Sequence, residues 1–352
     1  MRISKGSKDF LLYDEKSNTY YLDEEQKVID QVEKDHWKIV IRTLIKDWRL
    51  YLMLIPMLFV FFCWRYLPMY ELLGAWKHNY DGSIKVADYA FVGYNNFDTI
   101  LFGSYHTQFW KAFRNTFILS FYGLLFGFPV PIILALFFNE IKSKLYRSVL
   151  QVMTYLPKFI STVIITTLVW FLLSNKNSLE PNSQPGIVAR VLALLGIISE
   201  EKAASGLMYE VSYFRPIYIL TGIWEGAGYG SIVYFAAIIA ISPTSYEAAQ
   251  IDGAGKMAQM RYVVLPSILS TIVIMLIVRI GSLLSIGYET VLLLQSNGTM
   301  TNAEVVSTFA ISIKDTQRHL STIPELLNNL TSMILVIGAN MISRKATDTS
   351  LY

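Results

Sequence analysis

Six long apolar stretches, each poor in charged residues, constrain this chain more than any other feature of its sequence. They occupy about residues 50–68, 113–138, 149–173, 217–241, 266–294 and 323–342. A helix that crosses the hydrocarbon core of a bilayer needs roughly 20 mainly apolar residues, and it satisfies its own backbone polar groups there. The stretches therefore predict an all-α integral membrane protein with six transmembrane helices.

The composition excludes several other classes of protein. Of 352 residues, 53% are hydrophobic and 16% are charged, whereas soluble domains carry roughly 25% charged residues. The only cysteine, Cys63, lies in an apolar stretch, so the chain has no internal disulfide framework and no cysteine-based metal cage. The net charge of +3 is spread along the chain, so no basic stripe for nucleic acid is expected.

Lysine and arginine residues near the ends of the stretches assign the two sides of the membrane. The relevant residues are Lys34 to Arg49 before the first stretch, Lys142 to Arg147 after the second, Lys256 and Arg261 after the fourth, and Arg344 and Lys345 after the sixth. Such residues stay in the cytoplasm because they resist translocation. We therefore expect a cytoplasmic N-terminal segment (1–49), a transmembrane domain (50–345) and a cytoplasmic tail (346–352).

The loop between the fourth and fifth stretches, residues 242–265, carries the most informative pattern. Thr244 and Glu247 have the spacing of a capping box, which predicts a helix that begins near Ser245. Gly253 and Gly255 are expected to end this helix. Small residues at its centre leave a low surface that the groove of a partner can approach closely. A plain turn between two membrane helices is the alternative.

This loop resembles the Glu-Ala-Ala signature of the permease subunits of bacterial ATP-binding-cassette importers. The matching residues are Glu247, Ala248, Ala249, Asp252, Gly253, Ala254, Leu265 and Pro266, and Met260 stands where the signature has phenylalanine. Segments 66–70, 92–97, 128–131 and 155–161 resemble the branch that imports oligosaccharides and complex carbohydrates. The resemblance implies a cytoplasmic coupling helix between helices 4 and 5, in which residues 247–260 contact an ATPase subunit.

The same resemblance implies a transport subunit of the bacterial plasma membrane that is not itself an enzyme. It would form half of the translocation pathway for an oligosaccharide or glycan. The implied partners are a second related permease, two ATPase subunits, an extracytoplasmic sugar-binding protein and membrane lipid. ATP and magnesium would belong to the ATPase subunits, and this chain would bind no cofactor. Residues 250–257 lack the first glycine and the hydroxyl residue of a phosphate-binding loop.

Charged and aromatic residues inside the apolar stretches are candidates for the substrate pathway. Arg279 costs roughly 2.5–3.5 kcal/mol at a bilayer centre unless it faces a polar interior. It either donates hydrogen bonds to the substrate or pairs with Glu225, next to Trp224, or with helix-end carbonyls. Tyr288 and Glu289 have the ring and the carboxylate that bind sugars. The alternative is that Tyr288 lies at the membrane interface and that Glu289 is solvated, without a role in sugar binding.

Glycines also recur at a spacing of four residues. Gly222, Gly226 and Gly230 share one helical face, and Gly123 and Gly127 repeat the spacing in the second stretch. This pattern predicts that the face packs closely against another helix. A flexible point that moves during transport is the alternative.

Two other classes of protein compete with the transporter subunit. A secondary transporter driven by an ion gradient typically has intramembrane acids and internal inverted repeats. A membrane enzyme that modifies polysaccharide needs a cluster of acids or a metal site. The sequence has no evident repeat and few intramembrane acids, and its four histidines, at positions 36, 78, 106 and 319, have no metal-ligand spacing.

Overall fold

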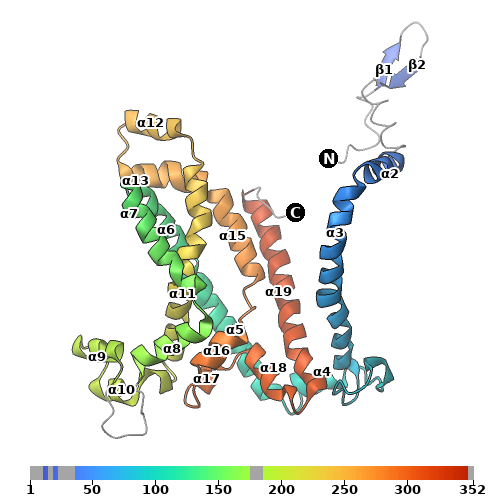
Figure 1. The fold of residues 1–352 in the computed structure, drawn as a ribbon, viewed down its shortest axis with the longest axis vertical. Helices are drawn as coiled ribbons and strands as arrows, with labels where there is room; N and C mark the ends of the chain where they lie inside the picture. The colour runs from blue at the N-terminus through green and yellow to red at the C-terminus, as the bar shows by residue number, and fades with distance from the viewer. Residues whose placement is uncertain (1–10, 15–18, 23–35, 175–184, 348–352) are drawn as a thin grey trace. The chain divides into compact units, whose positions relative to one another are not determined.

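The protein is described by a computed structural model for residues 11–14, 19–22, 36–174 and 185–347. The chain divides into two compact units, residues 1–72 and 73–352, and Figure 1 labels the elements of each. Lys34 and most of the predicted cytoplasmic tail, 346–352, lie outside the described residues.

The first unit has a short hairpin and a long apolar helix. β1 (Leu11–Asp14) pairs antiparallel with β2 (Thr19–Leu22). α2 (His36–Lys46) precedes α3 (Trp48–Phe61), which continues through a π-helical turn, η2 (Phe62–Tyr66), into the 3-10 segment η3 (Leu67–Trp76). The boundary between the two units falls within η3, after Leu72. No residue of α3 is buried within the described structure, although nearly all its side chains are apolar. Such a helix is typical of one surrounded by lipid or by a partner.

The second unit is built around α11 (Phe214–Ile239), a helix of 26 residues. α5 (His106–Tyr122), the π-helical turn η5 (Gly123–Gly127) and α6 (Pro129–Glu140) form a continuous helical path, and its α6 part packs along α11. α19 (Arg318–Thr347) packs against α15 (Leu269–Gly281) and α18 (Val306–Lys314). The predicted helical fold is therefore confirmed for this unit.

Shorter elements connect these helices. They are η4 (Val86–Asp88), α4 (Asn95–Leu101), α7 (Lys144–Tyr155), η6 (Leu156–Phe159), α8 (Thr162–Leu173), α9 (Ile187–Leu194), α10 (Glu200–Ser205), η7 (Leu207–Tyr209), α12 (Pro243–Ile251), α13 (Lys256–Gln259), η8 (Met260–Val264), α14 (Leu265–Ser267), α16 (Tyr288–Leu294) and α17 (Met300–Ala303).

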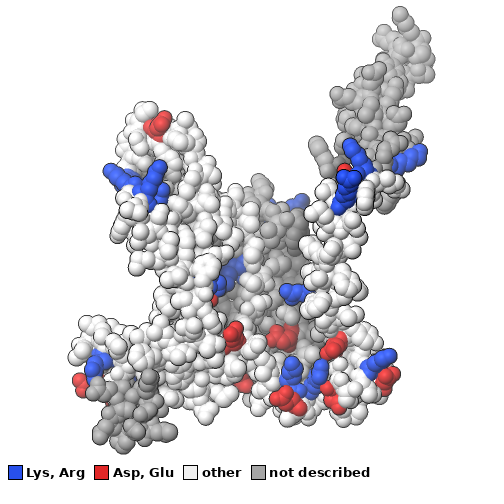
Figure 2. All heavy atoms as spheres, in the orientation of Figure 1, with Lys and Arg blue, Asp and Glu red and all other residues white. Residues whose placement is uncertain are grey.

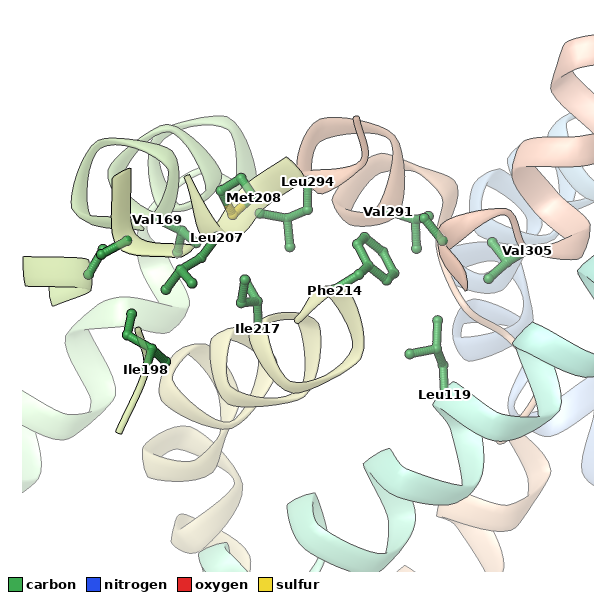
Figure 3. Close-up of a cluster of buried hydrophobic side chains, with 13 residues drawn as sticks. Leu119, Val169, Ile198, Leu207, Met208, Phe214, Ile217, Val291, Leu294 and Val305 are labelled. Carbon is green, nitrogen blue, oxygen red and sulfur yellow. The ribbon is translucent and has the colours of Figure 1, made fainter. Parts of the chain in front are cut away.

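Two separate hydrophobic cores hold the two ends of α11. At one end, Phe214 and Ile217 pack in a cluster with Val291 and Leu294 of α16 (Figure 3). At the other end, Tyr234 and Ile238 pack with residues of α6, η8 and the start of α15. Each large apolar side chain that is fully buried stabilises the fold by roughly 1.5–3 kcal/mol. The middle of α11, which carries the repeated glycines, lies between the two cores.

The helices agree in length and composition with membrane-spanning segments. Trp48–Trp76, His106–Glu140 and Arg318–Arg344 are each long and apolar enough to cross a bilayer. Three further pairs of helices pass the same test together but are bent by 101°, 70° and 60°. Among the described residues, three spans are therefore present, or up to six if each bent pair counts as one span.

The third and fifth stretches, predicted over 149–173 and 266–294, are not single straight helices. In the third, α7 and α8 are separated by η6, where Pro157 occupies the first turn and Ile160 is extended. Proline interrupts a helix because it lacks an N–H and its ring clashes with the preceding turn. In the fifth, α15 ends at Gly281 and α16 begins at Tyr288, so residues 282–287 are unwound.

Side chains satisfy the backbone of the unwound segment. Asn328 of α19 donates a hydrogen bond from Nδ2 to the carbonyl oxygen of Leu284 over 2.9 Å, and this contact is buried. Ser307 of α18 donates from Oγ to the carbonyl oxygen of Ile286 over 2.9 Å. Irregular backbone at membrane depth is tolerated only where protein or water supplies such partners.

Candidate functional site

A cavity of about 390 Å³ lies beside the middle of α11. Its walls come from η5, α6, η6, α11, α15 and α16, and the side chains that give it chemical character are Lys158, Tyr218, Glu225, Met275, Arg279 and Thr290. This volume falls within the range of roughly 300–1,000 Å³ that is typical of small-molecule sites.

Two of the three repeated glycines open this cavity instead of packing against another helix. A Cβ added at Gly222 or Gly226 would meet nothing within 4 Å, so the predicted close packing is wrong at both positions. It is confirmed at Gly230, where an added Cβ would lie 3.3 Å from Cγ of Pro131 in α6. A still tighter contact occurs at Gly228, where an added Cβ would lie 2.0 Å from the carbonyl oxygen of Thr154. Because Gly228 lies two residues from Gly226, it points away from the cavity wall. Glycines spaced four residues apart lie on one face of a helix, but the spacing does not show what that face contacts.

Three charged side chains line the cavity. Lys158 Nζ lies 2.8 Å from Glu225 Oε1, which makes an ion pair between η6 and α11. The alternative in which Glu225 pairs with Arg279 is therefore wrong. Arg279 has no ion pair and no side-chain hydrogen bond within the described structure. Its Nη2 atom would lie 3.8 Å from a Cβ added at Gly123, an ordinary van der Waals contact, so the guanidinium lies beside this glycine.

The other predicted pathway residues lie outside this lining. Trp224 is 45% exposed, on the part of α11 that does not line the cavity. Tyr288 and Glu289 are exposed on the first turn of α16, whereas the next residue, Thr290, reaches the cavity. Sequence reasoning missed Lys158 and Tyr218. Lys158 is a charged residue inside the third apolar stretch, so the criterion that selected Arg279 applies to it equally.

The second candidate site is the segment from α12 to η8, at one end of the second unit (Figure 1). α12 begins at Pro243, two residues before the predicted start, with Pro243 in its first turn. Proline is favoured there because its φ is already helical, and because an N–H at that position would have no partner within the helix. The predicted cap at Thr244 is therefore wrong, and its hydroxyl instead lies 2.7 Å from that of Ser242.

α12 ends just before Gly253, as the sequence predicted from Gly253 and Gly255. Gly253 has a φ of +76°, in the left-handed region. Ala254 N–H donates to the carbonyl of Ala249 over 2.8 Å, and Gly253 N–H donates to that of Gln250 over 3.0 Å. These two bonds form a Schellman motif, which satisfies the last carbonyls of the helix. The chain then reverses into α13 and the π-helical turn η8.

Two contacts with the body of the unit hold this segment in place. Tyr246 of α12 packs against the core that contains Tyr234 and Ile238, and burial raises the pKa of its phenol, while the side chain of Asn139 opposes this effect. Lys256 of α13 forms an ion pair with Glu140, the last residue of α6. The segment is therefore fixed on its inner side.

The outer side of the segment is exposed. Glu247, Ala248, Asp252 and Gly253 are exposed, whereas Ala249, Ala254 and Met260 are half-buried. Two large apolar side chains also lie open here, with Ile251 87% exposed and Met257 74% exposed. Apolar side chains gathered at an exposed helix end are typical of a protein contact surface.

Charge is distributed unevenly over the second unit. Figure 2 shows charged side chains of both signs at the α12–α13 end and at the opposite end, and a mostly uncharged surface between them. The basic residues at the first end include Lys142, Lys144, Lys256 and Arg261, all exposed. No group of three or more His, Cys, Asp or Glu side chains within the described residues is placed to hold a metal ion.

Comparison with known proteins shows which family this chain resembles in sequence. Residues 127–342 match the family of binding-protein-dependent transport system inner membrane components. Two relatives from Bacillus subtilis (strain 168) align over most of their length. Protein LplB is 32% identical and aligned over 87% of this chain and 92% of its own. The polygalacturonan/rhamnogalacturonan transport system permease protein YteP is 33% identical over 91% of this chain and 95% of its own.

A solved structure has the same fold. A chain of a bacterial ATP-binding-cassette transporter involved in the import of the acidic polysaccharide alginate superposes with a TM-score of 0.74 and 36% identity, covering 88% of this chain and 99% of that one. A structure of a bacterial alginate transporter in complex with a periplasmic protein bound to an alginate pentasaccharide also superposes, with a TM-score of 0.74 and 35% identity. With its membrane-length helices and its matching relatives, the chain belongs to the family of inner-membrane components of binding-protein-dependent transport systems.

Proposed function

We propose that this chain forms half of the translocation pathway of an ATP-driven importer for an oligosaccharide or glycan that an external binding protein delivers. One observation carries the proposal: the glycine-walled cavity beside α11 and the exposed signature segment at α12 belong to the same unit. The named polysaccharide substrates of YteP and of the alginate importer support a carbohydrate as cargo.

We place six spans in the membrane: the three long helices, the bent α7–α8 pair, α11, and the span that contains α15 and α16, with α12 and α13 outside the membrane. The basic residues at the α12–α13 end support a cytoplasmic location for that end, because lysine and arginine remain on the cytoplasmic side. The basic residues before the first span and after the sixth support the same location for both termini. A second, related permease would complete the cavity on its open side. Membrane lipid would cover the remaining apolar surface, which includes α3.

In this proposal the segment 242–265 is the coupling element and α12 is the coupling helix. An ATPase subunit would contact its exposed residues, Glu247, Ala248, Asp252 and Gly253, while Ala249, Ala254 and Met260 shape the surface from their half-buried positions. The complex would contain two ATPase subunits, which hold ATP and magnesium. Their closure would move α12, and the anchors at Tyr246 and Lys256 would transmit that motion to the core around Tyr234 and to α6.

The substrate pathway would pass through the cavity lined by Glu225 and Arg279. Trp224, Tyr288 and Glu289 lie on the same elements, α11 and α16, just outside the lining. In the completed assembly they would contact the sugar on its way to the cavity or face the second permease. The chain supplies hydrogen bonds, charge and shape to this pathway and performs no covalent step.

Isolation of the intact complex tests the proposal. The chain, tagged at its C-terminus, is purified in mild detergent from its native membrane, and co-purifying proteins are identified by mass spectrometry. We expect an ATPase and a second permease, with ATP hydrolysis stimulated several-fold by the loaded binding protein. Isolation of the chain alone, with uptake that follows an ion gradient and ignores ATP, would identify a secondary transporter instead.

A further inference from the structure

Arg279 carries the charge in the cavity that the described residues do not compensate. It lies eleven residues into α15, after a nearly continuous run of apolar residues. The cavity lining contains one carboxylate, that of Glu225, which pairs with Lys158 over 2.8 Å. Keeping a cation at this depth is costly unless a polar partner is present for part of the transport cycle.

Acidic residues on the neighbouring elements α16 and α19 do not fill that role in the structure. Glu289 is exposed on α16 and is not part of the lining, and Glu325 of α19 is half-buried away from it. The guanidinium of Arg279 is exposed to the cavity, where Gly123 and Gly222 present no side chains. A ligand can therefore approach Arg279 without displacing an internal partner.

We propose that Arg279 binds the carboxylate of an acidic sugar residue, so that this cavity takes an oligosaccharide that contains uronic acid. The inference rests on the proposed import function and adds the charge of the cargo. A guanidinium binds a carboxylate with two parallel charged hydrogen bonds, which a hydroxymethyl group cannot replace. The Lys158–Glu225 pair satisfies its own charges, so Arg279 is the residue that distinguishes an acidic sugar from a neutral one.

Protection from chemical modification tests this contact without the binding protein. The purified complex is treated with phenylglyoxal, which modifies accessible arginine, in the presence of either trigalacturonate or α-1,4-galactotriose. These trisaccharides differ only in carrying a carboxylate or a hydroxymethyl group at C6. We expect Arg279 to be modified in the free complex and protected by trigalacturonate but not by galactotriose. Equal protection by both sugars, or no modification without sugar, would overturn the proposal.

Transport measurements on variants test the role of Arg279 during uptake. In proteoliposomes with ATP and the binding protein, Arg279→Gln should lower kcat/KM for trigalacturonate by roughly 10- to 100-fold, the value of a charged hydrogen-bonded contact. Arg279→Lys keeps the charge but not the pair of parallel hydrogen bonds, and should recover only part of that loss. Arg114→Gln removes an arginine from an exposed position outside the cavity lining and should change uptake less than twofold.

The outcomes separate this inference from the function on which it rests. If Arg279→Gln still assembles with the ATPase and transports trigalacturonate at the wild-type rate, the acidic-cargo proposal fails while the importer stands. If the variant loses the second permease during purification, Arg279 pairs with an acid of that subunit, and the proposal is also overturned. If no ATPase co-purifies with the wild-type chain, the importer function itself fails.

Discussion

At the scale of single residues, neighbouring glycines of α11 have opposite roles. Gly226 faces the cavity and leaves it open, whereas Gly228 brings α11 against the backbone of Thr154 in α7. The sequence predicted that glycines on this helix matter, and it identified the shared face of Gly222, Gly226 and Gly230. It did not predict which face was packed, because that depends on where the broken third span passes.

These two glycines provide a matched pair of substitutions. Gly228→Ala should destabilise the complex by about 1–3 kcal/mol, because its Cβ would overlap the carbonyl oxygen of Thr154 and force the helices apart. Gly226→Ala adds the same methyl group to open space and should leave stability unchanged. The midpoint of thermal unfolding in detergent measures both effects. Equal midpoints for the two variants would show that α11 and α7 are not packed as described.

At the scale of elements, the informative features are the breaks. The end of α12 was predictable because Gly253 gives a local signal that needs no tertiary partner. The unwound segment 282–287 was not, because its stability depends on Asn328 and Ser307, which come from later helices. Composition predicts that a stretch is long and apolar enough to span a membrane. It does not predict that the helix stays continuous across it.

The contact of Asn328 with the unwound segment makes a testable prediction. Asn328→Ala should leave the buried carbonyl of Leu284 without its donor, at a cost of about 1–3 kcal/mol. We expect faster hydrogen exchange across α16, which follows this segment, and a lower thermal midpoint. Ser332→Ala is the control, because Ser332 lies one turn away and bonds only to a carbonyl of its own helix. If exchange in α16 is the same in both variants, the side chain of Asn328 does not hold the break.

At the scale of the whole molecule, the sequence predicted the class of protein better than the details of its site. Long apolar stretches and one loop signature were sufficient for a membrane transport subunit, and the family match confirms that class. The site could not be predicted without the fold, because Lys158, Glu225 and Arg279 are far apart in the chain and come together only around the cavity beside α11. A pair between Arg279 and Glu225 was one of the alternatives because both are intramembrane charges, and only the position of η6 shows that Glu225 pairs with Lys158.

The proposed coupling surface on α12 makes the last prediction, which concerns assembly. Ile251 ends α12 with 87% of its side chain exposed, as expected for a residue that becomes buried against an ATPase. Burying such a side chain is worth roughly 1.5–3 kcal/mol, so Ile251→Ser should weaken binding of the purified ATPase by about 10- to 100-fold. The control is Leu194→Ser, which removes a side chain that is 79% exposed on α9, away from α12 in the same unit (Figure 1). Titration of the ATPase onto the immobilised permease pair measures both affinities. Equal affinities would show that the ATPase does not bury the end of α12, and the coupling surface would then have to be sought on another cytoplasmic segment.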